Sequence, residues 1–106
     1  MKYIYLLKIE DLDVYKIGHT KNDVFKRVHQ LQTGNPYKIV LIDSYKSKIA
    51  TKIESVMHRY MNYKKYIPED DKKLLGEWFK LNSDDVSKFK EECIRIEKNL
   101  IATIIF

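Results

Sequence analysis

The first 20 residues carry the pattern that most limits how this chain can fold. In residues 2–9, every odd-numbered position holds a tyrosine or an aliphatic side chain, and these share one face of an extended strand. Residues 10–13 are mostly acidic and fit a turn, and residues 14–18 form a second short strand. The pattern predicts a β-hairpin, so an antiparallel sheet is expected to begin the fold.

A helix is predicted directly after this hairpin. Val24, Val28 and Leu31 fall on one helical face. Thr20 or Asn22 is expected to cap the helix, because short polar side chains accept hydrogen bonds from its first amides. A Thr-Gly-Asn-Pro turn ends it.

The remaining chain alternates between strand and helix patterns. Residues 39–42 are a continuous apolar run, which predicts a buried central strand. Residues 47–60 predict a helix, residues 61–75 an exposed loop, and residues 77–81 a strand that precedes a last helix. The order β-β-α-β-α-β-α predicts an α+β domain with a small, three- to four-stranded, mostly antiparallel sheet flanked by about three helices.

A length of 106 residues predicts a single domain over residues 1–99, followed by an apolar tail at 100–106. The tail is compatible with an edge strand, a packed extension or a contact between two copies in a homodimer. The only cysteine, Cys93, excludes an intrachain disulfide, and no apolar run is long enough to span a membrane. We therefore expect a cytoplasmic protein of a reducing compartment; a nuclear or virus-associated location fits the same features.

The charge is unevenly distributed along the chain. Residues 1–66 carry 13 Lys or Arg and 6 Asp or Glu, whereas residues 67–106 carry 7 and 9. A basic front half favours an anionic partner, nucleic acid first, although a solvated lysine-rich surface has the same composition.

Five residues carry the chemistry of phosphodiester hydrolysis with one divalent metal. They supply a phenol, an ammonium, a guanidinium, a carboxylate and an imidazole: Tyr5, Lys16, Arg27, Glu54 and His58. The last two lie four positions apart, on one face of the predicted helix.

The order of these residues resembles the GIY-YIG nuclease superfamily. Residues 3–5 stand at its first motif and residues 16–18 at its second, with Arg27 and Glu54 at its arginine and metal-binding glutamate. Lys16 departs from the superfamily, in which a second tyrosine is usual. Tyr15 cannot take that place, because neighbouring residues on a strand point to opposite faces.

Further pieces resemble a compact branch that is often phage- or virus-borne. These are the Lys-Ile-Gly second motif, the Thr-Gly-Asn-Pro turn at residues 33–36, the Ile-Glu pair with His58, and Gly-Glu-Trp-Phe at residues 76–79. The match covers residues 3–81 and implies a DNA endonuclease.

The resemblance also implies a role for each residue. Tyr5 would activate water directly or through a hydrogen bond, with Lys16 and Arg27 supplying positive charge and Arg27 holding the phosphate. Glu54 would bind Mg²⁺ or Mn²⁺. His58 would orient that carboxylate, contact phosphate or ligate metal; a bond to a backbone carbonyl is the equal alternative.

Three other residues are candidates for contacts with nucleic acid. His19 lies in the turn after the hairpin and can reach phosphate. Lys64 and Lys65 belong to a basic, aromatic-rich stretch that suits DNA contacts, although an ordinary polar loop looks the same. Trp78 and Phe79 suit either base stacking or core packing, and packing is expected for at least one of them.

Three functions follow. The first is a metal-dependent endonuclease that cleaves DNA. The second is a nucleic-acid-binding module of the same fold with weak or no activity, favoured by the lysine at position 16. The third is a protein-interaction domain that pairs through its apolar tail.

Overall fold

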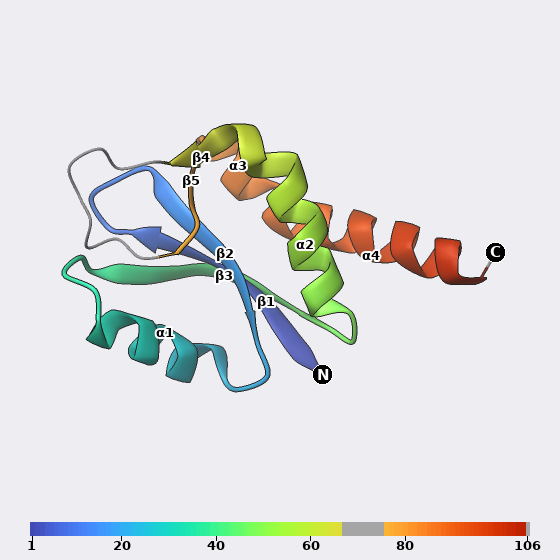
Figure 1. Ribbon diagram of the computed structural model, residues 1–106, viewed down its shortest axis with the longest axis horizontal. Coiled ribbons are helices and arrows are strands. Elements are labelled where there is room, and N and C mark those ends of the chain that lie inside the picture. The colour runs from blue at the N-terminus through green and yellow to red at the C-terminus, as the bar shows by residue number, and fades with distance from the viewer. Residues whose placement is uncertain (67–75, 106) are drawn as a thin grey trace.

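The computed structural model describes residues 1–66 and 76–105, and it confirms the predicted α+β architecture (Figure 1). Five antiparallel strands form one sheet in the order β3-β1-β2-β5-β4. The sheet exceeds the predicted three to four strands because a two-residue strand follows the second long helix and pairs with β5. The strands are β1 (Lys2–Ile9), β2 (Val14–Thr20), β3 (Ile39–Ser47), β4 (Lys65–Tyr66) and β5 (Trp78–Lys80).

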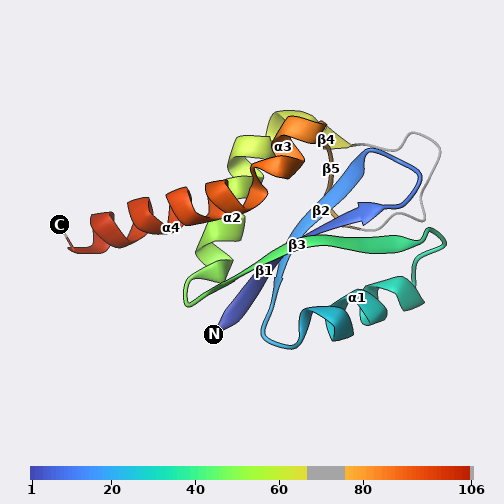
Figure 2. The same ribbon diagram turned by 180° about the vertical axis from the view of Figure 1, so that it is seen from behind.

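Helices cover both faces of the sheet, so the domain has two apolar layers. The helices are α1 (Val24–Thr33), α2 (Ala50–Met61), the 3₁₀ turn η1 (Asn62–Lys64), α3 (Ser83–Ser87) and α4 (Phe89–Ile105). Figures 1 and 2 show α1 on one side of the strands and α2 with α4 on the other. One layer contains Tyr5, Leu7 and Trp78 beside α1, and the other contains Ile4 and Phe79 beside α2 and α4.

The predicted hairpin is confirmed, and its register sets the first part of the site. Tyr5 lies opposite Gly18, and Leu7 lies opposite Lys16. Directly opposed residues point to the same face of a sheet. Tyr5 and Lys16 therefore share the face that α1 covers.

The prediction that residues 39–42 form a central strand is wrong in one respect, because their strand, β3, lies at an edge of the sheet. Among the described strands it pairs with β1 alone, and Ile42 is 39% exposed. Ile39 is buried in the layer beside α1, and Leu41 is half-buried against it. The central strands are β1 and β2 instead.

Asp23 caps α1 in place of the predicted Thr20 or Asn22. Its Oδ1 accepts hydrogen bonds from the amides of Phe25, at 2.8 Å, and Lys26, at 3.2 Å. The Thr20 hydroxyl accepts instead from the amide of Asn22, at 3.1 Å. Asp23 has the better position because it directly precedes the first helical residue.

The tail continues α4 up to residue 105, so the edge-strand alternative is wrong (Figure 1). The helix is fastened to β3 by Glu97, which accepts hydrogen bonds from Tyr45, at 2.8 Å, and from Ser47, and by a 3.1 Å ion pair between Lys90 and Asp43. A homodimer through the tail stays a prediction. Residues 67–75 of the predicted loop, and residue 106, lie outside the described part of the chain.

None of the helices among the described residues is long and apolar enough to cross a membrane.

Gly18 allows the Tyr5 ring to lie directly on the neighbouring strand. A Cβ atom at position 18 would lie 2.4 Å from the Tyr5 hydroxyl oxygen and 2.5 Å from Cζ. Such distances are far below van der Waals contact, so any side chain at this position must displace the ring.

We predict that Gly18→Ala lowers the free energy of unfolding by about 1–3 kcal/mol, as overpacking of a core does. Gly34→Ala is the matched control, because no atom lies within 4 Å of its Cβ position and its φ of −99° suits any residue. We expect the control to be neutral or slightly stabilising. Urea titration measures both. Equal stability of the two variants would contradict the close packing of Tyr5 on Gly18.

Candidate active site

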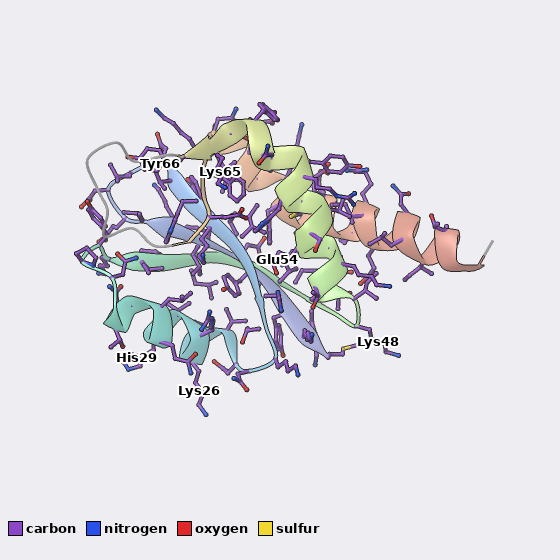
Figure 3. All side chains as sticks on the ribbon, viewed as in Figure 1. Lys26, His29, Lys48, Glu54, Lys65 and Tyr66 are labelled. Atoms are coloured by element: carbon purple, nitrogen blue, oxygen red, sulfur yellow. The ribbon has the colours of Figure 1, made fainter. Side chains whose placement is uncertain are left out.

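The five residues with the chemistry of phosphodiester hydrolysis meet in one shallow pocket of about 300 Å³. They come from separate elements: Tyr5 from β1, Lys16 from β2, Arg27 from α1, and Glu54 and His58 from α2. Ile17, Gly18, His19 and Glu77 complete the lining. In Figure 3, Glu54 extends from α2 toward the sheet, whereas Lys26 and His29 point from α1 away from it.

Tyr5 lies at the base of this pocket and is only 2% exposed. Burial raises the pKa of its hydroxyl above the ordinary value of 10.0, although the Arg27 guanidinium opposes the shift by a hydrogen bond and by its charge. The ring is fixed by packing on Gly18. The phenol is therefore protonated at neutral pH and rigidly placed beside a guanidinium.

Lys16 is a half-buried cation on the same sheet face. Its Nζ lies 5.4 Å from the centre of the Trp78 ring, a cation–π contact. Burial lowers the pKa of the ammonium, as does the charge of Arg27, while Glu54 and Glu77 act in the opposite direction. Tyr15 lies in the other layer, so it cannot replace Lys16, as predicted.

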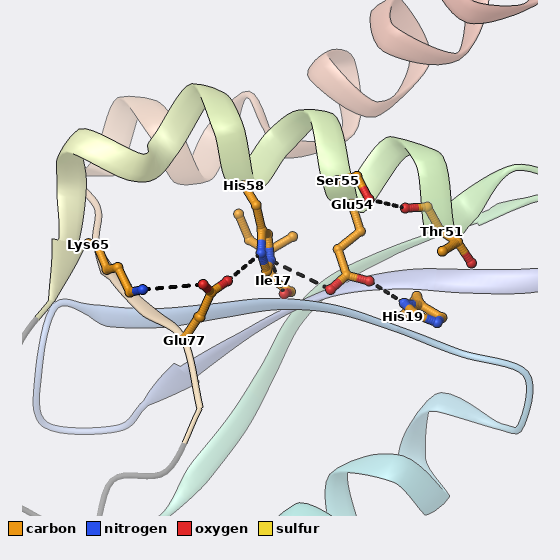
Figure 4. Close-up of polar contacts among 8 residues, drawn as sticks. All are labelled: Ile17, His19, Thr51, Glu54, Ser55, His58, Lys65 and Glu77. Atoms are coloured by element: carbon orange, nitrogen blue, oxygen red, sulfur yellow. Dashed lines mark hydrogen bonds and ion pairs between the residues drawn. The ribbon is translucent and has the colours of Figure 1, made fainter.

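Glu54 holds the centre of a chain of polar contacts (Figure 4). Its Oε2 accepts a short hydrogen bond from Nδ1 of His19, and its Oε1 lies 3.6 Å from Nε2 of His58. The preceding residue, Ile53, is fully buried. Because Ile53 is buried, Glu54 lies at the edge of the buried helix face and its side chain points into the pocket. The Glu54 side chain is 20% exposed.

His58 makes the bond to a backbone carbonyl that was the alternative prediction, and it also contacts the Glu77 carboxylate. Its Nε2 lies 2.7 Å from the Ile17 carbonyl oxygen, and its Nδ1 lies 2.7 Å from Oε2 of Glu77. Hydrogen bonds from Lys65 and His58 outweigh burial and hold the pKa of Glu77 below its ordinary value, so it is an ionised acceptor. Each ring nitrogen of His58 therefore faces an oxygen atom, and in this arrangement neither nitrogen is free to bind a metal.

Residues 2–95 match the T5orf172 domain. The chain belongs to this family. The T5orf172 domain is a phage-derived domain of the GIY-YIG-like, nuclease-associated group, and the match supports the nuclease-type superfamily without deciding the branch. No curated protein and no solved structure is significantly similar to the chain.

Glu77 is the pocket residue of this T5orf172 domain to which the sequence assigned no role. It stands 19 positions after His58, just before β5, and it bonds both His58 and Lys65. The signal was present in the Gly-Glu-Trp-Phe string of residues 76–79. Base stacking by the two aromatic residues is not what the structure shows, because Trp78 is 3% and Phe79 1% exposed.

The two predicted DNA-contact lysines are held by carboxylates. Lys64 Nζ lies 2.5 Å from Oδ2 of Asp85, and Lys65 Nζ lies 3.2 Å from Oε1 of Glu77. Lys65 is the more exposed of the two. The Lys64 pair joins η1 to α3, whereas the Lys65 pair borders the pocket.

The pocket holds two carboxylates, Glu54 and Glu77, and Glu77 is paired with His58 and Lys65. Among residues 1–66 and 76–105, no group of three or more His, Cys, Asp or Glu side chains is arranged to hold an ion by itself. Magnesium is often bound by one or two carboxylates together with water and phosphate oxygens. Glu54 has the oxygen donors for such a site, and the pocket does not fit a metal cage made of protein ligands alone.

We predict that Tyr5 ionises above pH 10, which absorbance titration can show as the difference between the wild type and Tyr5→Phe. Folding raises this pKa, so the phenol's contribution to stability is complete below the ordinary pKa and is lost as the pH rises through the folded one. Arg27→Met should raise the pKa further. Arg95→Met, which removes a guanidinium paired with Glu92 on α4, should leave it unchanged. A Tyr5 phenol that ionises below pH 10 would contradict the assignment.

Proposed function

We propose that this T5orf172 domain is a metal-dependent endonuclease that hydrolyses phosphodiester bonds in DNA. The observation that carries the proposal is the convergence of Tyr5, Arg27 and Glu54 from three separate elements on one pocket. Membership of a nuclease-associated family and the basic front half of the chain support it.

Arg27 binds the scissile phosphate. A guanidinium can donate to two phosphate oxygens at once and stabilise the charge that grows on them in the transition state. Its Nη1 contacts the Gln30 side chain on the next turn of α1 at 3.4 Å, a long and exposed bond that a phosphate can displace.

Tyr5 acts through its hydrogen bond to the attacking water. Its raised pKa favours a neutral phenol over a standing phenolate, so the hydroxyl oxygen accepts a bond from the water and aligns it with phosphorus. The phenol proton can pass to a phosphate oxygen as the water proton arrives. Arg27 favours this transfer because it stabilises negative charge on the phenol oxygen.

Lys16 adds positive charge around the reacting phosphate, His58 lines the same pocket, and the products are 5′-phosphate and 3′-hydroxyl ends. Glu54 would hold Mg²⁺ or Mn²⁺, which when bound supplies charge that neutralises the leaving 3′ oxygen. His19 and His58 hold the Glu54 carboxylate oriented toward the pocket.

A nucleic-acid-binding module with weak activity is the second candidate. Lys16 stands where the superfamily usually has a second tyrosine, and the Tyr5 phenol lacks a pKa suited to a free base. Both candidates need the basic pocket. Only the endonuclease also needs the Glu54 carboxylate for cleavage.

We predict that Glu54→Gln abolishes metal-dependent cleavage, by on the order of 1,000-fold, while DNA affinity stays equal or rises. A metal ligand acts mainly in the transition state, and removing a carboxylate lessens repulsion of phosphate. Tyr5→Phe should also slow cleavage with little change in affinity, whereas Arg27→Ala should lower both. Single-turnover cleavage and fluorescence anisotropy of labelled DNA measure the two quantities.

Glu10→Gln is the matched control, because it removes a half-exposed carboxylate paired with Lys38 outside the pocket. It should leave cleavage and binding unchanged. Wild-type protein that binds DNA but breaks no duplex, branched or single-stranded substrate with Mg²⁺ or Mn²⁺ would exclude the endonuclease and leave the binding module.

DNA affinity should fall steeply with salt, because each neutralised phosphate adds roughly 0.9 to the slope of log affinity against log salt. Lys65→Gln should lower this slope by about one such contact, if β4 borders the bound DNA. Lys98→Gln, on the exposed side of α4, is the control and should not change it. Salt-independent binding by the wild type would argue against nucleic acid as the partner.

A further inference from the structure

The segment of residues 76–79 contacts Lys16 and His58, two side chains of the pocket that flank Glu54. Gly76 and Trp78 lie against Lys16, whereas Glu77 and Phe79 lie against His58. We propose that this segment is a positioning element, which holds Lys16 and His58 in the places from which they act on the bound phosphate. The catalytic part of this inference rests on the proposed endonuclease.

The alternation follows from the strand itself. Successive side chains of an extended chain point to opposite faces. β5 pairs with β2 so that Tyr15 lies opposite Phe79, and the next pair in this antiparallel register is Lys16 with Trp78. The register therefore delivers Trp78 to the face of Lys16 and Phe79 to the other face, where α2 carries His58.

The Lys16 ammonium is confined from two sides. The Trp78 ring lies 5.4 Å away and is itself buried, which gives the cation a low-dielectric π face. On the other side, a Cβ atom at Gly76 would lie 2.7 Å from Nζ. Gly76 has a φ of +91°, a conformation that glycine adopts without strain. A glycine at this position therefore provides both the space for the ammonium and the backbone conformation.

The His58 ring is confined in a corresponding way. Glu77 accepts from Nδ1 at 2.7 Å, and the Phe79 ring meets the imidazole edge to face with centroids 5.2 Å apart. Phe79 is buried, so the ring cannot tilt toward it. Glu77 also bonds Lys65 at 3.2 Å, which connects the predicted DNA-contact stretch to the site.

The position of each side chain matters because a group that stabilises the transition state must face it. A displacement of about 1 Å can cost on the order of 100-fold in rate. Glu77 is not proposed to contact the bound phosphate. It acts by holding the His58 ring in place. Its removal should therefore change the rate of cleavage more than the affinity for DNA.

Trp78 is the only tryptophan, so its emission reports the Lys16 contact whether or not the protein cleaves DNA. Lys16→Met should shift the tryptophan emission. Lys8→Met is the matched control, because Lys8 makes the same kind of contact, 5.9 Å from the Tyr15 ring in the other layer. It should leave the emission unchanged. Identical spectra for wild type and Lys16→Met would overturn the Lys16 half of the proposal.

Glu77→Gln tests the other half, with Glu10→Gln as a control of equal side-chain exposure, 49%. The ring nitrogen and proton resonances of His58, assigned with His58→Gln, should move in Glu77→Gln and not in the control. Resonances that stay in place in Glu77→Gln would show that the carboxylate does not hold the ring.

Cleavage then separates positioning from simple structure. Glu77→Gln should lower the single-turnover rate by at least about tenfold without weakening DNA binding. Gly76→Ala, which crowds the ammonium, should act in the same direction. An unchanged rate in Glu77→Gln beside an active wild type would overturn the proposal. An inactive wild type whose emission and His58 resonances respond as expected would instead refute the endonuclease and leave the positioning of both side chains standing.

Discussion

The site depends on the direct packing of the Tyr5 ring against the backbone of Gly18. The two residues lie opposite each other in the β1–β2 hairpin, and the absence of a side chain at position 18 lets the phenol rest on β2. The hydroxyl then lies beside Arg27 from α1. Lys16, two residues earlier on the same strand, shares its face, and Glu54 reaches the same pocket from α2. One close contact between two strands thus sets where two other elements, α1 and α2, must bring their charged side chains.

The sequence predicted the parts of this arrangement that local pattern controls. The alternation of residues 2–9 specified the hairpin, and the hairpin specified which side chains share a face with Tyr5. The apolar stripe of residues 47–60 specified that Glu54 and His58 lie on one helical face beside Ile53. The convergence of these elements came from the resemblance to a nuclease superfamily, because no local pattern states which helix covers which side of a sheet.

The parts that the sequence did not predict depend on pairing between distant segments. A continuous apolar run at residues 39–42 suits a central strand and an edge strand equally, since half-buried aliphatic side chains are common at both. The Glu77–His58 contact depends on the register between β5 and β2. The sequence of a three-residue strand is too short to predict that register. The tail of residues 100–105 lacks Gly and Pro, so no helix-breaking residue interrupts α4 there. Its apolar composition suits a strand equally well, so the sequence did not decide between the two.

The stereochemistry of cleavage at phosphorus tests the central claim most directly. A DNA substrate with one phosphorothioate of known configuration at the cut site, cleaved in isotopically labelled water, shows whether water or Tyr5 attacks phosphorus. A single in-line attack by water aligned on the Tyr5 hydroxyl inverts the configuration and yields a labelled 5′-phosphorothioate, and this is the expected result. Retention would mean a covalent intermediate on the protein, and would contradict the role given to the phenol.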